Sequence, residues 1–432
     1  MQDWTWGLLG PGTLASSRRA RSLGLAASVR TFNDLAVPGM GNVWFGKQLV
    51  LAALGLRVAR ELDGDFSNAE VTNAIEALAC WMAFKHNGYG PDSRLRGRTK
   101  LARLDSVSFR QARQRGFYVA QPMRVATVQA LPALGLVEDG AARFNSMMIS
   151  DLGIDLVHEA CAPYSPSGGK VVDALVKWVR GTGKPPGHNS ALNEALSPIH
   201  PLPESARELL RERLHHGGRQ EPIGDKHRRR DALAWVGAMG SGMPAPLSWS
   251  AAPPQIQDAA HWKDLHAGAL FLATRTAALA ALDHLEAQMV DQQPTSLDRP
   301  VSAGLAKRCD DLTQAARRFL DSGHADPDAR QFCTECVDAD PAEVLRRLVA
   351  RDGRVLRLEG RMVHPGPAFR GGVEVAGEDE LENDDVPEAV AASAVAWLEG
   401  ISNRVPNLFA LHLDLNGQYD TWRAAQAAGG LQ

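Results

Sequence analysis

Four residues of the C-terminal third are of the types that bind zinc. Cys333 and Cys336 are separated by two residues, a spacing that lets both thiolates reach one metal ion. Cys309 and His324 lie upstream and can complete a set of four ligands. A single CxxC pair is a weak signal by itself, so we expect reduced cysteines and no cofactor, with a zinc site as the alternative.

A second group has the types used in acid–base or metal chemistry. His412 and Asp414 alternate with apolar residues over 409–415, a pattern that predicts a strand with both polar side chains on one face. Together with His364 or Glu359 they suit a metal-dependent hydrolase or nuclease. Polar residues on the exposed face of a strand explain the same pattern, and this is the interpretation we favour.

Positive charge is concentrated in one part of the chain. From Lys85 to Arg124 the sequence has ten Lys or Arg residues and two acidic residues, a local net charge of +8, whereas the whole chain has a net charge of −3. Such a cluster can neutralise phosphates, and phosphate contacts supply most of the sequence-independent affinity for nucleic acid. Tyr89, Phe117 and Tyr118 lie among these cations and can stack on bases. A solvated basic surface is the alternative. The predicted phosphate contacts are Arg94, Arg96, Arg98, Lys100, Arg103, Arg110, Arg113 and Arg115.

A further basic group is expected in a loop between two helices. It consists of His215, His216, His227, Arg228, Arg229 and Arg230. The arginines can bind phosphate without sequence preference, and a solvated helix connection is the alternative.

The order of local signals over residues 108–160 is the most specific in the chain. Pro122 suits a first helical position, Gly135 a left-handed helix end, and Asp139 with Gly140 a hairpin turn. The expected order is a helix over 108–115, a turn at Gly116, a helix over 122–134, a strand from Leu136, the turn, a return strand over 143–149 and a final helix from Asp151. This order resembles a winged-helix domain, at the level of the superfamily.

The resemblance implies contact with double-stranded DNA through the second helix and the wing. Pro132 lies inside that helix, where its missing N–H and its ring predict a kink or an early end. The side chains that would reach base edges are Gln121, Arg124, Thr127 and Gln129, and Arg143 would contact DNA from the wing.

Composition excludes several classes of protein. The 432 residues are 44% apolar and 22% charged, which is ordinary for a soluble globular protein of two or three domains. Five cysteines are too few for a disulfide framework, so we expect a reducing cytoplasm. The most apolar run, residues 43–59, contains Lys47 and Arg57, and spanning a membrane takes about 20 apolar residues, so we expect no membrane partner. Arginine greatly outnumbers lysine, which is typical of a high-GC bacterial gene.

Proline and glycine divide the chain into three expected domains. These are residues 1–162 with the winged helix, a helical connector over 163–254, and an α-rich domain over 255–432 with short strands. The last domain is expected to contain a long Ala-rich helix over 256–290, a half-buried strand over 354–363 and an acidic loop over 374–385.

The predicted fold class is mainly α, a multi-domain helical protein with an embedded winged helix and a small C-terminal β element. We expect a non-enzymatic subunit of a bacterial DNA-directed system, such as a mobile element or antiviral defence, that binds double-stranded DNA and other protein subunits. The alternatives are a metal-dependent hydrolase that uses the C-terminal His, Asp or Cys residues, and a protein–protein adaptor that uses the long helix.

Overall fold

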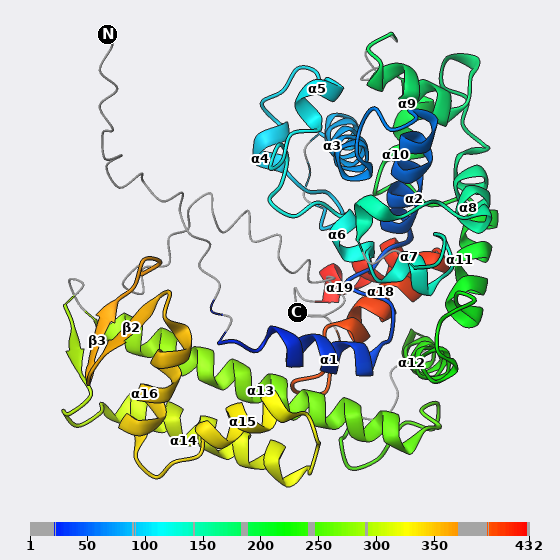
Figure 1. Cartoon of the computed structure of the whole chain (residues 1–432). Helices are drawn as coiled ribbons and strands as arrows, with labels where there is room; N and C mark the ends of the chain where they lie inside the picture. The colour runs from blue at the N-terminus through cyan, green and yellow to red at the C-terminus, as the bar shows by residue number, and fades with distance from the viewer. Residues whose placement is uncertain are drawn as a thin grey trace, which may run out of the picture. The chain divides into compact units, whose positions relative to one another are not determined.

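The computed structural model describes residues 21, 23–88, 90, 92–140, 143–182, 189–240, 247–289, 293–369, 395 and 397–429. Over these residues the chain is mainly helical and has a small sheet, which confirms the predicted fold class of a mainly α protein with a small β element (Figure 1). They divide into two compact units. Unit 1 contains the described residues of Met1–Thr31 and Ala267–Val375, and unit 2 those of Phe32–His266 and Ala376–Gln432.

Unit 2 is built around α2 (Gly46–Glu61), a helix that is buried along nearly its whole length. It corresponds to the apolar run over residues 43–59. The neighbour α3 (Asn68–His86) begins at Ser67, whose hydroxyl accepts a hydrogen bond from the Glu70 backbone N–H. The two helices approach closely because Gly55 has no side chain, and a Cβ there would lie 2.8 Å from the Thr72 Cα.

The other elements of unit 2 are mostly short helices around this pair. They are α4 (Arg98–Leu101), α5 (Phe109–Ala112), α6 (Arg124–Thr127), α7 (Ala130–Ala133), η1 (Phe144–Ser146), α8 (Asp151–Cys161), η2 (Pro166–Gly168), α9 (Val171–Val179), α10 (Ser190–Leu196), α11 (Glu204–His216), α12 (Ile223–Gly240), α18 (Arg404–Leu415) and α19 (Tyr419–Gly429). The last turns of α1 (Ala26–Ala36) also belong to unit 2. The helices that pack directly on α2 are α3, α6, α7, α8, α9 and α18.

One hydrophobic core extends through unit 2. It includes Leu51 and Leu78 from α2 and α3, and it also includes Leu175, Leu210 and Val236 from the segment that was expected to connect two domains. The segment over 163–254 therefore contributes buried side chains to the same core as the N-terminal helices.

The strand predicted over residues 409–415 is wrong, because this segment lies inside the helix α18. The alternation of apolar residues suggested a strand, yet Ala410 between them is also fully buried. A helix that is covered on all sides has no polar face, so an apolar run of this length does not distinguish helix from strand.

The helix predicted over residues 122–134 is divided into α6 and α7. The interruption falls at Val128 and Gln129, and Val128 is four residues before Pro132, the position whose carbonyl a proline ring clashes with. The predicted return strand over 143–149 is mostly the η1 turn, with one isolated bridge between Val137 and Ile149. Whether the segment is a winged helix stays a prediction.

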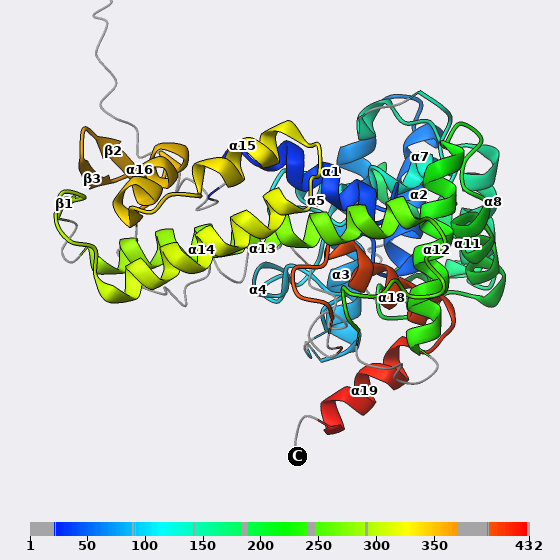
Figure 2. The same cartoon turned by 90° about the horizontal axis from the view of Figure 1, so that it is seen from below.

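Unit 1 contains most of α13 (Ala259–Gln288), together with α14 (Ala303–Asp321), α15 (Pro327–Glu335) and α16 (Pro341–Asp352). Figures 1 and 2 both show α14 alongside α13. The bounds of α13 confirm the long Ala-rich helix predicted over 256–290. By length and composition α13 is the one helix among the described residues that could cross a membrane, and half of its apolar stretch is buried.

A small antiparallel sheet completes unit 1. Its strands are β1 (Thr295–Ser296), β2 (Leu356–Glu359) and β3 (Met362–Pro365), in the order β1-β3-β2. The single strand predicted over 354–363 is thus a hairpin, which turns at Gly360 with a φ of +62°. The acidic segment over 374–385 lies outside the described residues.

Candidate nucleic-acid interface

The residues from 98 to 116, here called the basic segment, are fixed to α3 by hydrogen bonds to backbone carbonyls. The Trp81 indole donates to the Leu104 carbonyl at 3.0 Å, and the Lys85 ammonium donates to the Asp105 carbonyl at 2.9 Å. Within the segment the Lys100 ammonium donates to the Gly116 carbonyl at 3.2 Å. These contacts hold a stretch that has little regular structure in a defined position.

The basic segment directs most of its cations to solvent. Arg98, Arg103, Arg110 and Arg115 are exposed, and Lys100 and Arg113 are half-buried. The only acidic residue in the segment is Asp105, so its net charge is +5. Six of the thirteen predicted nucleic-acid contacts therefore lie together on one stable stretch of surface.

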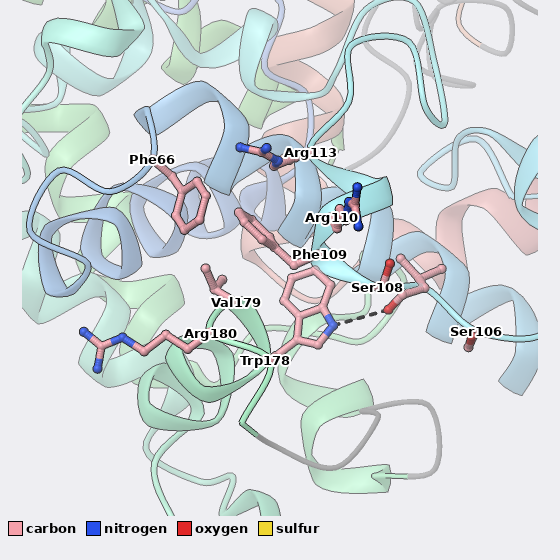
Figure 3. A pocket seen from close by; sticks show the side chains of 11 residues that line it. Phe66, Ser106, Ser108, Phe109, Arg110, Arg113, Trp178, Val179 and Arg180 are labelled. Carbon is pink, nitrogen blue, oxygen red and sulfur yellow. Dashed lines mark hydrogen bonds between the residues drawn. The ribbon is translucent and has the colours of Figure 1, made fainter.

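A pocket of about 440 Å³ opens beside the basic segment. Its lining residues are Phe66, Ser106, Val107, Ser108, Phe109, Arg110, Arg113, Trp178, Val179, Arg180 and Gly181. Figure 3 shows the rings of Phe66, Phe109 and Trp178 in a row, with Arg110 and Arg113 on one side and Arg180 on the other. The rings meet edge to face, with centroids 4.8 Å apart for Phe66 and Phe109 and 5.7 Å apart for Phe109 and Trp178.

The arginines around the pocket differ in how firmly they are held. Arg113 donates to Glu70 at 3.0 Å and lies over the Phe66 ring at 5.3 Å. The Ser67 N–H and hydroxyl, with Arg113, hold the pKa of Glu70 below its ordinary value although burial opposes this. Arg180 donates to the Glu61 carbonyl at 3.5 Å, whereas the Arg110 guanidinium has no hydrogen bond or ion pair with any described residue. Arg110 is therefore the cation most available to a ligand.

Two of the predicted phosphate contacts, Arg94 and Arg96, are buried. Arg94 donates to Asp92 at 2.9 Å and to Asp420 at 2.7 Å, and its side chain is 5% exposed. Arg96 is also buried and donates to the Gln121 carbonyl at 3.2 Å. Both guanidinium groups are used inside the protein, so neither can reach a phosphate on the surface.

Three of the four side chains predicted to read base edges, those of Arg124, Thr127 and Gln129, have hydrogen-bond partners inside the protein. Thr127 is fully buried, and its hydroxyl donates to the Arg124 carbonyl. The Arg124 guanidinium donates to Asn73 at 2.6 Å, and Gln129 accepts a hydrogen bond from Arg404 at 2.6 Å. Their polar groups are occupied by internal partners, so α6 and α7 do not present a groove-reading surface.

Gln121 and Arg143 have different surroundings. Gln121 is half-buried and its carbonyl accepts from Arg96, while Arg143 is exposed ahead of η1. Arg143 is thus the one residue of the predicted wing and second helix that keeps a cation at the surface among the described residues.

The second basic group is part of a helix and not a loop, because α12 includes Arg228, Arg229 and Arg230. Arg229 is fully buried and donates to Glu221 at 2.6 Å. Arg228 forms an ion pair with Asp264 at 2.8 Å, and only Arg230 is exposed. Two of the three charges are neutralised internally, which leaves little for a second phosphate contact.

The cysteines predicted as zinc ligands are buried in unit 1. Burial raises the pKa of Cys309 and of Cys333 to about 12 and also raises the pKa of Cys336. His324 accepts a hydrogen bond from the Asp326 N–H at 3.2 Å. Among the described residues no group of three or more His, Cys, Asp or Glu side chains is arranged to hold a metal ion.

His412 and Asp414 do not share a face, because residues two apart on a helix point in different directions. Asp414 is half-buried and accepts a hydrogen bond from the Gly46 N–H at 2.8 Å, at the start of α2. Burial raises the pKa of Asp414 and lowers that of His412. The His364 Nε2 and a Glu359 carboxylate oxygen lie 3.6 Å apart in the hairpin of unit 1. The predicted acid–base group is therefore not assembled.

Sequence reasoning missed the aromatic pocket. Phe66 and the stretch from Trp178 to Arg180 come from two separate places along the chain, and no local pattern connects them with Phe109. No family model, curated protein or solved structure matches this chain.

Proposed function

We propose that the chain is a non-enzymatic nucleic-acid-binding subunit that contacts phosphates through its basic segment. The observation that supports this is the position of Arg98, Arg103, Arg110 and Arg115, all exposed on a stretch of chain that is held against α3 and contains one acidic residue. Clustered guanidinium groups displace counterions from a polyanion, which gives affinity without sequence preference.

The proposed mode of contact differs from the reading of base edges by a recognition helix. With the polar groups of α6 and α7 turned inward, affinity comes from the backbone of the nucleic acid and from the basic segment. All five cysteines are free and buried, which is in accord with a reducing cytoplasm. A bacterial DNA-directed complex with further protein subunits stays our proposal for its setting.

The proposal is tested by measuring the affinity for a fluorescent duplex of about 25 base pairs between about 50 and 200 mM salt. The test variant replaces Arg98, Arg110 and Arg115 with Gln, and the control replaces the exposed Arg317 of α14 with Gln. Each neutralised phosphate contributes about 0.9 to the slope of log K against log salt concentration, so the triple variant is expected to lower that slope by about 2 to 3. An unchanged slope in the triple variant contradicts the proposal, and so does an equal loss in the Arg317→Gln control.

A further inference from the structure

We infer that the pocket beside the basic segment binds one unpaired nucleobase, so that the preferred ligand is a single strand of nucleic acid. This inference rests on the proposed function, because the flanking phosphates would be held by the basic segment. It adds the class of nucleic acid, which the positive charge alone does not specify.

The shape and composition of the pocket carry the first step. Its volume of about 440 Å³ lies within the range of about 300–1,000 Å³ that is usual for organic ligands. Phe66 is half-buried at the pocket, while Phe109 and Trp178 are 5% and 8% exposed. An aromatic wall accepts any base, because every base has a π face.

The rigidity of the aromatic wall carries the second step. Phe109 packs edge to face between Phe66 and Trp178, at interplanar angles of 73° and 79°. The Trp178 indole N–H donates to the Val107 carbonyl at 3.3 Å, which fixes the ring (Figure 3). A base that enters therefore meets side chains that have already lost their rotational freedom, which lowers the entropy cost of binding.

The charge at the rim carries the third step. Arg110 has no internal partner among the described residues and lies at the pocket together with Arg113 and Arg180. A nucleotide has a flat apolar base and an anionic phosphate next to it, and this pairing of groups matches aromatic rings beside guanidinium groups.

Duplex nucleic acid does not fit the same pocket. In a duplex both faces of a base are covered by its neighbours, and turning one base out costs a few kcal/mol. An unpaired base avoids this cost, so a single strand is expected to bind more tightly than a duplex with the same number of phosphates.

The test compares three probes with the full chain at several salt concentrations between about 50 and 200 mM. The probes are an oligothymidylate, a strand of abasic sites with the same number of phosphates, and a duplex that also matches in phosphates. The wild type is expected to prefer the oligothymidylate to the abasic strand by about tenfold, in line with the usual strength of base–aromatic stacking. Phe66→Leu is expected to remove most of that preference and to leave the affinity for the abasic strand unchanged.

Two further variants separate a lost pocket from a lost fold. Ser106→Trp enlarges an exposed residue of the pocket lining, and it is expected to act like Phe66→Leu. Phe369→Leu changes a half-buried phenylalanine of unit 1 and is expected to keep the preference. Equal binding of oligothymidylate and abasic strand by the wild type overturns the inference, and a preference that survives in both pocket variants does so too. If all probes bind with steep salt dependence but without preference, only this inference fails. If none shows salt dependence, the proposed function fails with it.

Discussion

Replacing Arg94 with Met distinguishes a structural arginine from a phosphate contact. The sequence places Arg94 in the predicted nucleic-acid cluster, but its guanidinium bonds to Asp92 and Asp420 and lies over the Tyr419 ring at 5.2 Å. The side chains of Arg94 and Asp92 are 5% and 4% exposed, whereas that of Asp420 is 53% exposed. The buried part of this network joins residue 94 to the start of α19.

The size of the effect follows from what the substitution leaves behind. Asp92 keeps an ion pair with Arg423 at 2.8 Å but loses its main partner. Removing one member of a buried pair costs about 3–5 kcal/mol, and the remaining Arg423 and the solvated Asp420 place the expected loss near the lower end, at about 3 kcal/mol.

The loss is also expected to depend on pH. Burial by itself raises the pKa of Asp92, but the hydrogen bonds and charge of Arg94 outweigh it and hold that pKa below its ordinary value. In the wild type this contribution is complete above the ordinary Asp range and is lost as pH falls, because the carboxylate is then protonated. The difference in stability between wild type and Arg94→Met is therefore largest near neutral pH and smaller in acid.

Urea unfolding followed by circular dichroism, at pH 7 and at about pH 3, measures these differences, because the contribution of Asp92 is lost only as pH falls below the ordinary Asp pKa. The exposed Arg98→Gln is the control and is expected to change the free energy of unfolding by less than about 0.5 kcal/mol. The double variant Arg94→Met with Asp92→Asn is expected to recover part of the loss, because no uncompensated charge remains. The reasoning is refuted if Arg94→Met is as stable as the wild type and lowers the affinity for nucleic acid.

Two further substitutions test the packing of α3. Burial raises the pKa of Glu76 to about 6, so ionising its carboxyl group destabilises the folded protein by about 2 kcal/mol as pH rises from the ordinary Glu range through 6. Glu76→Gln is expected to remove this pH-dependent part of the free energy of unfolding. Equal pH profiles of unfolding for the wild type and Glu76→Gln would disprove it. Gly55→Ala is expected to destabilise the protein by about 1–3 kcal/mol in thermal unfolding, because its Cβ meets Thr72. The control Gly224→Ala, whose Cβ has nothing within 4 Å, is expected to be neutral or stabilising. A larger loss of stability in Gly224→Ala than in Gly55→Ala contradicts the close packing.

Local signals mark the starts of two helices of unit 1. Proline at a first helical position and an aspartate before it mark the starts of α15 and α16, where Asp326 and Asp340 accept hydrogen bonds from backbone N–H groups. These signals act over a few residues, so a single sequence contains all that is needed. The length of α13 follows in the same way from its uninterrupted apolar and alanine content.

Which arginines are buried and which are exposed could not be predicted from such local signals. Asp420 is 326 residues from Arg94, and Asp34 is 370 residues from its partner Arg404, so the counterions that bury these guanidinium groups are not visible in local sequence. The pocket has the same origin, because Phe66, Phe109 and Trp178 meet only after the chain has folded. Interactions over such separations depend on tertiary packing, which propensity and periodicity do not describe.

One local difference nevertheless separates the two kinds of arginine. Arg94 follows Asp92 by two residues. The Asp92 carboxylate accepts hydrogen bonds from both the backbone N–H and the guanidinium of Arg94, so this arginine has a counterion close by in the sequence. Arg110 has no acidic residue closer than Asp105 along the chain, and it keeps its charge at the surface. A guanidinium group is buried only when an anion accompanies it, since burial without one costs far more than the contacts return. The scarcity of acidic residues over 98–116 therefore does more than raise the net charge, because it leaves Arg98, Arg110 and Arg115 exposed at the surface, where an external anion can reach them.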